Sequence, residues 1–164
     1  MVIPSPGKAR AMVSHRQSYL RTAEALVHHV WDALRTNGPL SPDEHRLASI
    51  LLAHPEWQRY WDGRARVPAS LEADPGRNPF LHVHLHDLIE RQALDRKPAI
   101  VADTLAAAGD RPDRRSVLIH RIMPVLWFCL TDALRTGSLL RLDAYAERVR
   151  GLRVATAPVR IRVG

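Results

Sequence analysis

The chain has 164 residues, of which 46% are hydrophobic and 25% charged. This length and balance are typical of one globular domain and exclude a disordered chain. No apolar run approaches the length needed to cross a bilayer, and residues 1–10 lack the apolar stretch of a secretory signal. Cys129 is the single cysteine, which excludes an internal disulfide. We therefore expect a cytoplasmic protein with no membrane association.

The net charge of +7 is concentrated at the two ends of the chain. Residues 1–21 and 141–164 each carry +4, whereas residues 22–140 carry −1. Basic ends of this kind are more often solubilising than nucleic-acid-binding. We therefore do not expect nucleic acid as the partner, and a protein partner or a second copy of this chain is the alternative.

The first half of the chain predicts helices separated by proline and glycine. Residues 1–7 contain two prolines and predict a disordered leader. A long amphipathic helix follows, over about 8–36, because Leu20, Ala23, Val27, Val30 and Leu34 recur at helical spacing. A second helix runs from about 41 to 54, with a short helical turn after it. Residues 62–77 form the longest predicted loop, which could cover a site.

The second half predicts four more helices and no strand. Their expected ranges are about 78–96, 98–109, 114–135 and 143–150. The tail, 152–164, alternates aliphatic residues with arginine, and we expect a flexible basic end rather than a strand. The prediction is an all-α bundle of about five to seven helices, with one domain over 8–151.

The helix over 114–135 has almost no polar face, so we expect the other helices to surround it. Pro124 lies inside it and predicts a bend, because proline removes one backbone hydrogen bond. His120 shares a stripe with Pro124, which favours a pocket near the bend. The alternative is a core histidine bonded to a backbone carbonyl.

The most informative stretch lies in the helix over 78–96. His82 and His86 are four residues apart and therefore stack on one helix face, with Glu90 one turn further along. His84 points to the opposite side. The leucines at 81, 85 and 88 form the expected core stripe, so His82 and His86 should be half-buried at its edge.

A His-x3-His pair is a common two-ligand unit for transition metals, but a site needs three or four ligands. The available partners are Glu90, His120 and His54. We therefore predict His82, His86, His120, Glu90 and His54 as candidate ligands of zinc or iron. Asp87 could orient a ligand histidine from outside. The alternative is that these histidines are hydrogen-bonded to ordinary neighbours, and no pattern here identifies catalytic residues.

Three blocks of sequence carry a family pattern, namely His54-Pro55-Glu56, Asn78-Pro79-Phe80-Leu81-His82 followed by His86, and Arg91-Gln92 with Asp95-Arg96-Lys97-Pro98. A weaker set runs from His120 to Gly137 and the helix around Tyr145. On these blocks, about residues 40–151 resemble a small bacterial family named domain of unknown function 1841. The resemblance implies a compact helical protein and supplies no activity.

The chain departs from this family after His120. Other members tend to carry glutamates at the next two turns, where this chain has Pro124 and Phe128. If those glutamates bind a metal in the other members, this chain has lost that metal or uses other ligands.

Two hypotheses follow. The first is a helical protein that binds one metal ion or small ligand near His82, His86 and His120, with 62–77 as a lid. The second is a non-enzymatic interaction module that uses its tryptophans and basic ends.

Overall fold

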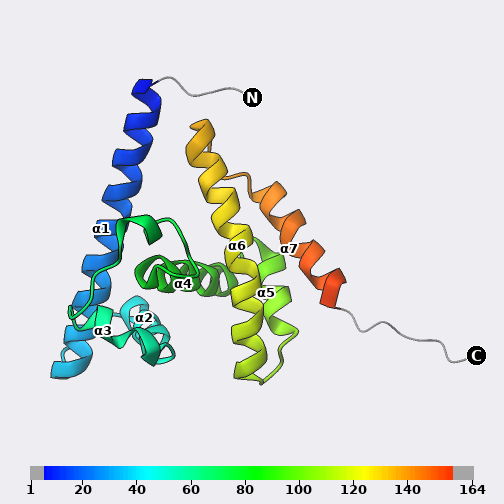
Figure 1. Cartoon of the computed structure of the whole chain (residues 1–164). Helices are drawn as coiled ribbons and strands as arrows, with labels where there is room; N and C mark the ends of the chain where they lie inside the picture. Colours follow the sequence, from blue (N-terminus) through cyan, green and yellow to red (C-terminus); the bar gives the residue numbers. More distant parts are fainter. Residues whose placement is uncertain (1–5, 157–164) are drawn as a thin grey trace, which may run out of the picture. The chain divides into compact units, whose positions relative to one another are not determined.

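The computed structural model describes the backbone of residues 6–156 and the side chains of residues 21–152. All regular elements in this part of the chain are helices, and it contains no strand, which confirms the predicted all-α class (Figure 1). The elements in chain order are α1 (Pro6–Thr36), α2 (Pro42–Leu52), η1 (Pro55–Trp57), α3 (Gln58–Trp61), η2 (Ala69–Leu71), α4 (Pro79–Asp95), α5 (Ala99–Ala106), α6 (Pro112–Thr136) and α7 (Leu142–Thr156).

Local sequence signals set the helix ends. Ser41 caps α2 in a capping box, in which its Oγ accepts the Glu44 N–H at 3.3 Å and its own N–H donates to the Glu44 carboxylate at 2.8 Å. Pro42 occupies the first turn, where its missing N–H costs nothing. Asn37 and Gly137 adopt positive φ values of 52° and 67° after α1 and α6. These residues end both helices in the left-handed conformation.

The helices divide into two compact units. The first comprises Met1–Leu88 and Leu134–Ser138, and the second Ile89–Ala133 and Leu139–Gly164. The boundaries fall inside α4 and near the end of α6. The predicted histidine pair on α4 therefore belongs to the first unit.

The core of the first unit joins α1, α2, α3 and the start of α4. Its buried members are Val27, Val30, Trp31, Leu47, Ala48, Ile50, Leu51, Trp61, Phe80 and Val83. The α1 and α2 residues recur at spacings of three and four, as expected for helices that bury one face. Two of the four tryptophans, Trp31 and Trp61, are thus core residues rather than surface anchors.

The second unit packs α5, α6 and α7. Its buried side chains include Val101, Leu105, Ile119, Ile122, Met123, Leu126, Tyr145 and Val149. Tyr145 is fully buried, and its hydroxyl donates to Gln92 Oε1 at 2.9 Å. Burial raises the pKa of Tyr145, because the apolar surroundings disfavour the phenolate.

Helix α6 is buried on one face only, so the prediction of a helix surrounded by others is wrong. Ile119, Ile122 and Leu126 are buried, whereas Val117 and Phe128 are 54% and 53% exposed. Apolar side chains all round a helix permit burial on every side but do not require it. The Phe128 ring instead lies 4.7 Å from the Arg148 guanidinium of α7, a cation–π contact.

By length and composition, α6 could also cross a membrane, contrary to the expectation that no segment would. Buried helices of soluble proteins meet the same criterion, and a single helix of this kind is weak evidence. Only 28% of the residues in this apolar stretch are buried in the structure.

The ends of the helical region differ from expectation. Helix α1 begins at Pro6, inside the predicted leader, and residues 1–5 lie outside the described part. Helix α7 continues to Thr156, so residues 152–156 are helical where a flexible tail was predicted. The rest of that tail, 157–164, lies outside the described residues.

Candidate metal centre

The predicted histidine pair lies near the start of α4. Asn78 caps this helix, because its Oδ1 accepts the Leu81 N–H at 3.2 Å. Its Nδ2 also donates to the Glu72 carbonyl at 2.9 Å, which ties the preceding loop to the helix. This cap fixes the residue at which α4 begins, and with it the positions of His82 and His86 on the first turns. The centres of their two rings lie 6.5 Å apart.

The first unit brings a third histidine to this pair. His54 lies between α2 and η1, and its ring centre is 4.9 Å from that of His82 and 5.7 Å from that of His86. One ring nitrogen of His54 and one of His86 lie within 4.8 Å of each other. The three imidazoles thus form a cluster, called the histidine cluster below, within one compact unit.

The histidine cluster is more buried than the sequence indicated. His54, His82 and His86 are 8%, 7% and 8% exposed, where His82 and His86 were expected to be half-buried. The difference arises because the segments around Trp57 and Pro75 cover the face of α4 that the leucine stripe leaves open. Histidine is intermediate in burial among the residue types, so these three lie at the buried end of its range.

Two of the three rings are oriented through Nδ1. The Nδ1–H of His54 donates to Glu56 Oε1 at 3.1 Å, and the Nδ1–H of His82 donates to the Pro75 carbonyl at 2.9 Å. A neutral imidazole that donates through Nδ1 carries its lone pair on Nε2. This is how carboxylates and backbone carbonyls orient ligand histidines in metal sites.

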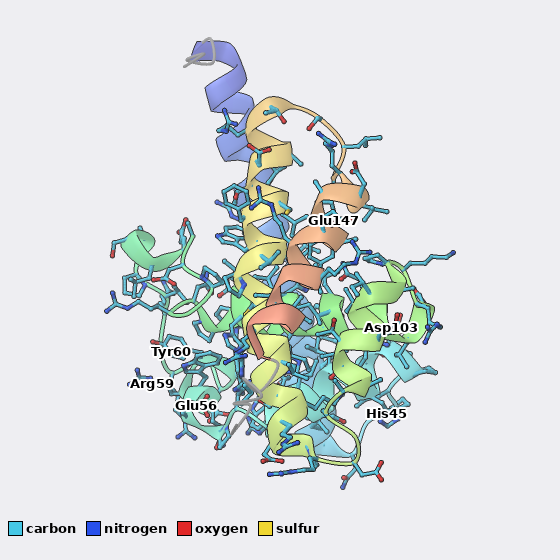
Figure 2. The ribbon with its side chains drawn as sticks, turned by 90° about the vertical axis from the view of Figure 1, so that its right-hand side faces the viewer. His45, Glu56, Arg59, Tyr60, Asp103 and Glu147 are labelled. Atoms are coloured by element: carbon cyan, nitrogen blue, oxygen red, sulfur yellow. The ribbon has the colours of Figure 1, made fainter. Side chains whose placement is uncertain are left out.

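Glu56 is held in its ionised form. Burial alone would raise its pKa, but hydrogen bonds from its own backbone N–H and from His54, together with the charges of His54 and His82, keep the pKa below the usual range. Glu56 is therefore ionised at neutral pH. Figure 2 shows it on the short segment that also carries Arg59 and Tyr60.

An indole ring packs directly against the histidine cluster. The Trp57 ring centre lies 4.5 Å from that of His82, edge-on, and 5.2 Å from that of His54, stacked. Trp61 meets Trp57 edge-on at 6.4 Å. This aromatic wall lowers the local dielectric, which strengthens electrostatic interactions within the cluster.

Two predicted acidic partners are engaged elsewhere. Glu90, a proposed ligand, belongs to the second unit, where both of its carboxylate oxygens pair with Arg115. Asp87, proposed to orient a histidine, accepts a hydrogen bond from Arg46 Nε at 2.7 Å. The structure therefore gives both carboxylates a guanidinium partner.

His120 lies on α6 and also belongs to the second unit. Its Nδ1 lies 3.5 Å from the Ser116 hydroxyl, one turn earlier. Its membership of the histidine cluster stays a prediction.

Three supporting groups were not identified as functional from the sequence. Glu56 and Trp57 lie two and three residues after His54, and the Pro75 carbonyl comes from the long loop. The Glu56 signal was present, since a carboxylate two residues after a candidate ligand can reach its ring. The contact of the Pro75 carbonyl could not be predicted, because a backbone carbonyl is present at every residue and only the path of the loop brings this one to His82.

Fold and site together define an all-α protein with three clustered buried histidines. The chain belongs to the family described as Domain of unknown function (DUF1841), whose model matches residues 19–151. No curated protein and no solved structure matches the chain.

Proposed function

We propose that this protein binds a divalent transition metal, zinc or iron, through His54, His82 and His86. The observation that carries the proposal is the convergence of three buried imidazoles from two separate segments, two of them oriented through Nδ1. Imidazole nitrogen is a preferred ligand for both metals. The Glu56 carboxylate supplies a negative charge close to the ion.

The ring spacing fits shared coordination. With Zn–N bonds of about 2.0–2.1 Å, tetrahedral ligation places the centres of two imidazole rings roughly 5 Å apart. The His54–His82 and His54–His86 separations of 4.9 and 5.7 Å lie near this value. The His82–His86 separation of 6.5 Å is wider, so one of these rings must turn toward the ion on binding.

Three histidines leave room for a further ligand. In zinc enzymes, three protein ligands hold the ion while a water or substrate takes the remaining position. The bound ion would act there as a Lewis acid that lowers the pKa of the water. His120 is the predicted alternative occupant of this position, in which case the site would be closed and structural.

The test is elemental analysis of protein purified without an affinity tag, compared with the variants His54→Gln, His82→Ala/His86→Ala and His45→Ala. His45 is exposed on α2 and serves as the matched control (Figure 2). We expect about one metal per chain in the wild type and in His45→Ala, and loss of metal in the other two. Helical circular dichroism should persist in all four proteins.

Wild-type protein with no stoichiometric metal, which also takes up none when zinc or iron(II) is added, would refute the proposal. Uptake that is equal in the wild type and the double variant would refute the assigned ligands. A His120→Ala variant distinguishes the open site from the closed one. Metal affinity should fall in this variant only if His120 is the fourth ligand.

A further inference from the structure

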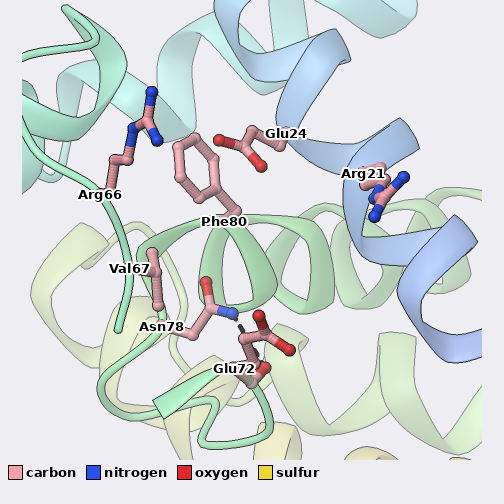
Figure 3. A pocket seen from close by; sticks show the side chains of 7 residues that line it. All are labelled: Arg21, Glu24, Arg66, Val67, Glu72, Asn78 and Phe80. Atoms are coloured by element: carbon pink, nitrogen blue, oxygen red, sulfur yellow. Dashed lines mark hydrogen bonds between the residues drawn. The ribbon is translucent and has the colours of Figure 1, made fainter. Parts of the chain in front are cut away.

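The first unit also contains a pocket that does not involve the histidine cluster. It has a volume of about 400 Å³ and lies between α1, the loop before α4 and the start of α4 (Figure 3). This volume falls within the range of small-molecule sites, about 300–1,000 Å³. The pocket is therefore large enough for a small metabolite.

Opposite charges line this pocket. Arg21 and Glu24 come from α1, and Arg66 and Glu72 come from the loop. Among the described residues, neither arginine takes part in a salt bridge or a side-chain hydrogen bond. Figure 3 shows Arg66 and Glu24 on either side of the Phe80 ring. The pocket thus offers two guanidinium groups and two carboxylates whose formal charges cancel.

The Phe80 ring gives the pocket a rigid apolar surface. Phe80 is 4% exposed, and it is held by His28, Trp61 and Tyr60 at ring-centre distances of 5.4, 5.6 and 6.5 Å. Such packing fixes the orientation of the ring at little further entropic cost when a ligand binds. A ligand with an apolar portion would contact it.

We propose that this pocket binds a small zwitterion of the amino-acid class, with its carboxylate toward Arg66, its ammonium toward Glu24 and its side chain against Phe80. A purely anionic ligand would be repelled by Glu24 and Glu72, and a purely cationic ligand would be repelled by Arg21 and Arg66. Like charges placed together cost binding energy, whereas a ligand that carries both signs avoids both penalties. The proposal is independent of the metal site.

The experiment is calorimetric titration of the metal-free chain with the common amino acids and with short dipeptides, which distinguishes a free amino acid from a peptide as the source. The best ligand is then compared with its N-acetyl and amide forms, each of which keeps one charge. We expect each blocked form to bind about ten-fold more weakly or worse, because one charge-assisted contact is lost. No binding by any member of the panel, or equal binding of the blocked forms, would overturn the proposal.

Matched variants localise the site. Arg66→Gln and Glu24→Gln each remove one charge from an exposed side chain that lines the pocket. Arg64→Gln is the control, since Arg64 is 78% exposed on the same loop and faces Asp62 at 3.7 Å instead. We expect the first two variants to weaken binding about ten-fold and the control to leave it unchanged. Binding that is unaffected by all three would place the ligand elsewhere and overturn the assignment.

Discussion

The side chains that fix the histidine rings matter as much as the rings themselves. Glu56 accepts the Nδ1 proton of His54, which leaves Nε2 as the donor atom toward a metal. A carboxylate that orients a ligand histidine in this way also strengthens metal binding.

We expect Glu56→Gln to reduce zinc affinity by about ten-fold or more, because partners that orient ligand histidines typically contribute that much. Competition with a chromogenic chelator measures the change. Glu147→Gln is the control, since Glu147 is exposed on α7 and pairs only with Arg150 among the described residues (Figure 2). An affinity equal to that of the wild type would show that Glu56 does not support the site.

The same residue predicts a pH dependence of stability in the metal-free protein. The pKa of Glu56 is lower in the folded protein than its ordinary value of 4.5, so folding favours the ionised form. This contribution is present above pH 4.5 and is lost as the pH falls through the depressed pKa. Urea unfolding from neutral pH down to about pH 3 should show the wild type losing its advantage over Glu56→Gln in that range. A difference that stays constant with pH would contradict the assignment.

Between elements, a buried ion pair in the first unit joins α2 to α4. Arg46 Nε donates to Asp87 Oδ1 at 2.7 Å, and their side chains are only 16% and 8% exposed. Removing the guanidinium partner of a buried carboxylate destabilises the fold, because it leaves an uncompensated buried charge. An exposed ion pair, by contrast, contributes little to the free energy of unfolding. Because Asp87 directly follows His86, this pair holds α4 against α2 next to the histidine cluster.

A double-mutant cycle with Arg46→Met and Asp87→Asn should give a coupling energy of about 2 kcal/mol in chemical unfolding. The exposed pair Arg141 and Asp143, at the same kind of distance of 2.9 Å, is the control. Its cycle, with Arg141→Met and Asp143→Asn, should give no more than about 0.5 kcal/mol. Equal couplings in the two cycles would show that burial does not strengthen the α2–α4 link.

Helix ends and helix order were predictable because their signals are local. The caps at Ser41 and Asn78 and the breaks at Asn37 and Gly137 act through neighbouring residues only. The exposed face of α6 was not predictable, since an apolar pattern on all sides does not say which side the other helices cover. Likewise, the spacing of His82 and His86 indicated their shared face, but the approach of His54 depends on how α2 and α4 pack in the first unit.

At the level of the whole molecule, the excess positive charge is concentrated at the two ends of the sequence. Residues 22–140 carry a net charge of −1, while each end carries +4. An electrostatic contact with nucleic acid would therefore have to use the ends, and its affinity would fall steeply with salt. The histidine cluster lies in the nearly neutral part, whereas the pocket also includes Arg21 from the basic N-terminal segment.

We predict no nucleic-acid binding at physiological ionic strength, measured as the mobility of labelled RNA and DNA mixed with the protein. Any shift seen at low salt should disappear on deletion of residues 152–164, which carry three of the basic side chains. A shift that survives physiological salt would contradict the prediction and favour a nucleic-acid role.

The indole of Trp57 gives the protein an intrinsic optical reporter. It touches two of the three clustered imidazoles, whereas Trp31 and Trp61 are buried in the aliphatic core of the first unit. An open-shell ion such as copper(II) bound there would quench the emission of this indole, and zinc would only shift it. Occupancy can thus be followed in solution by fluorescence alone, without labels or crystals.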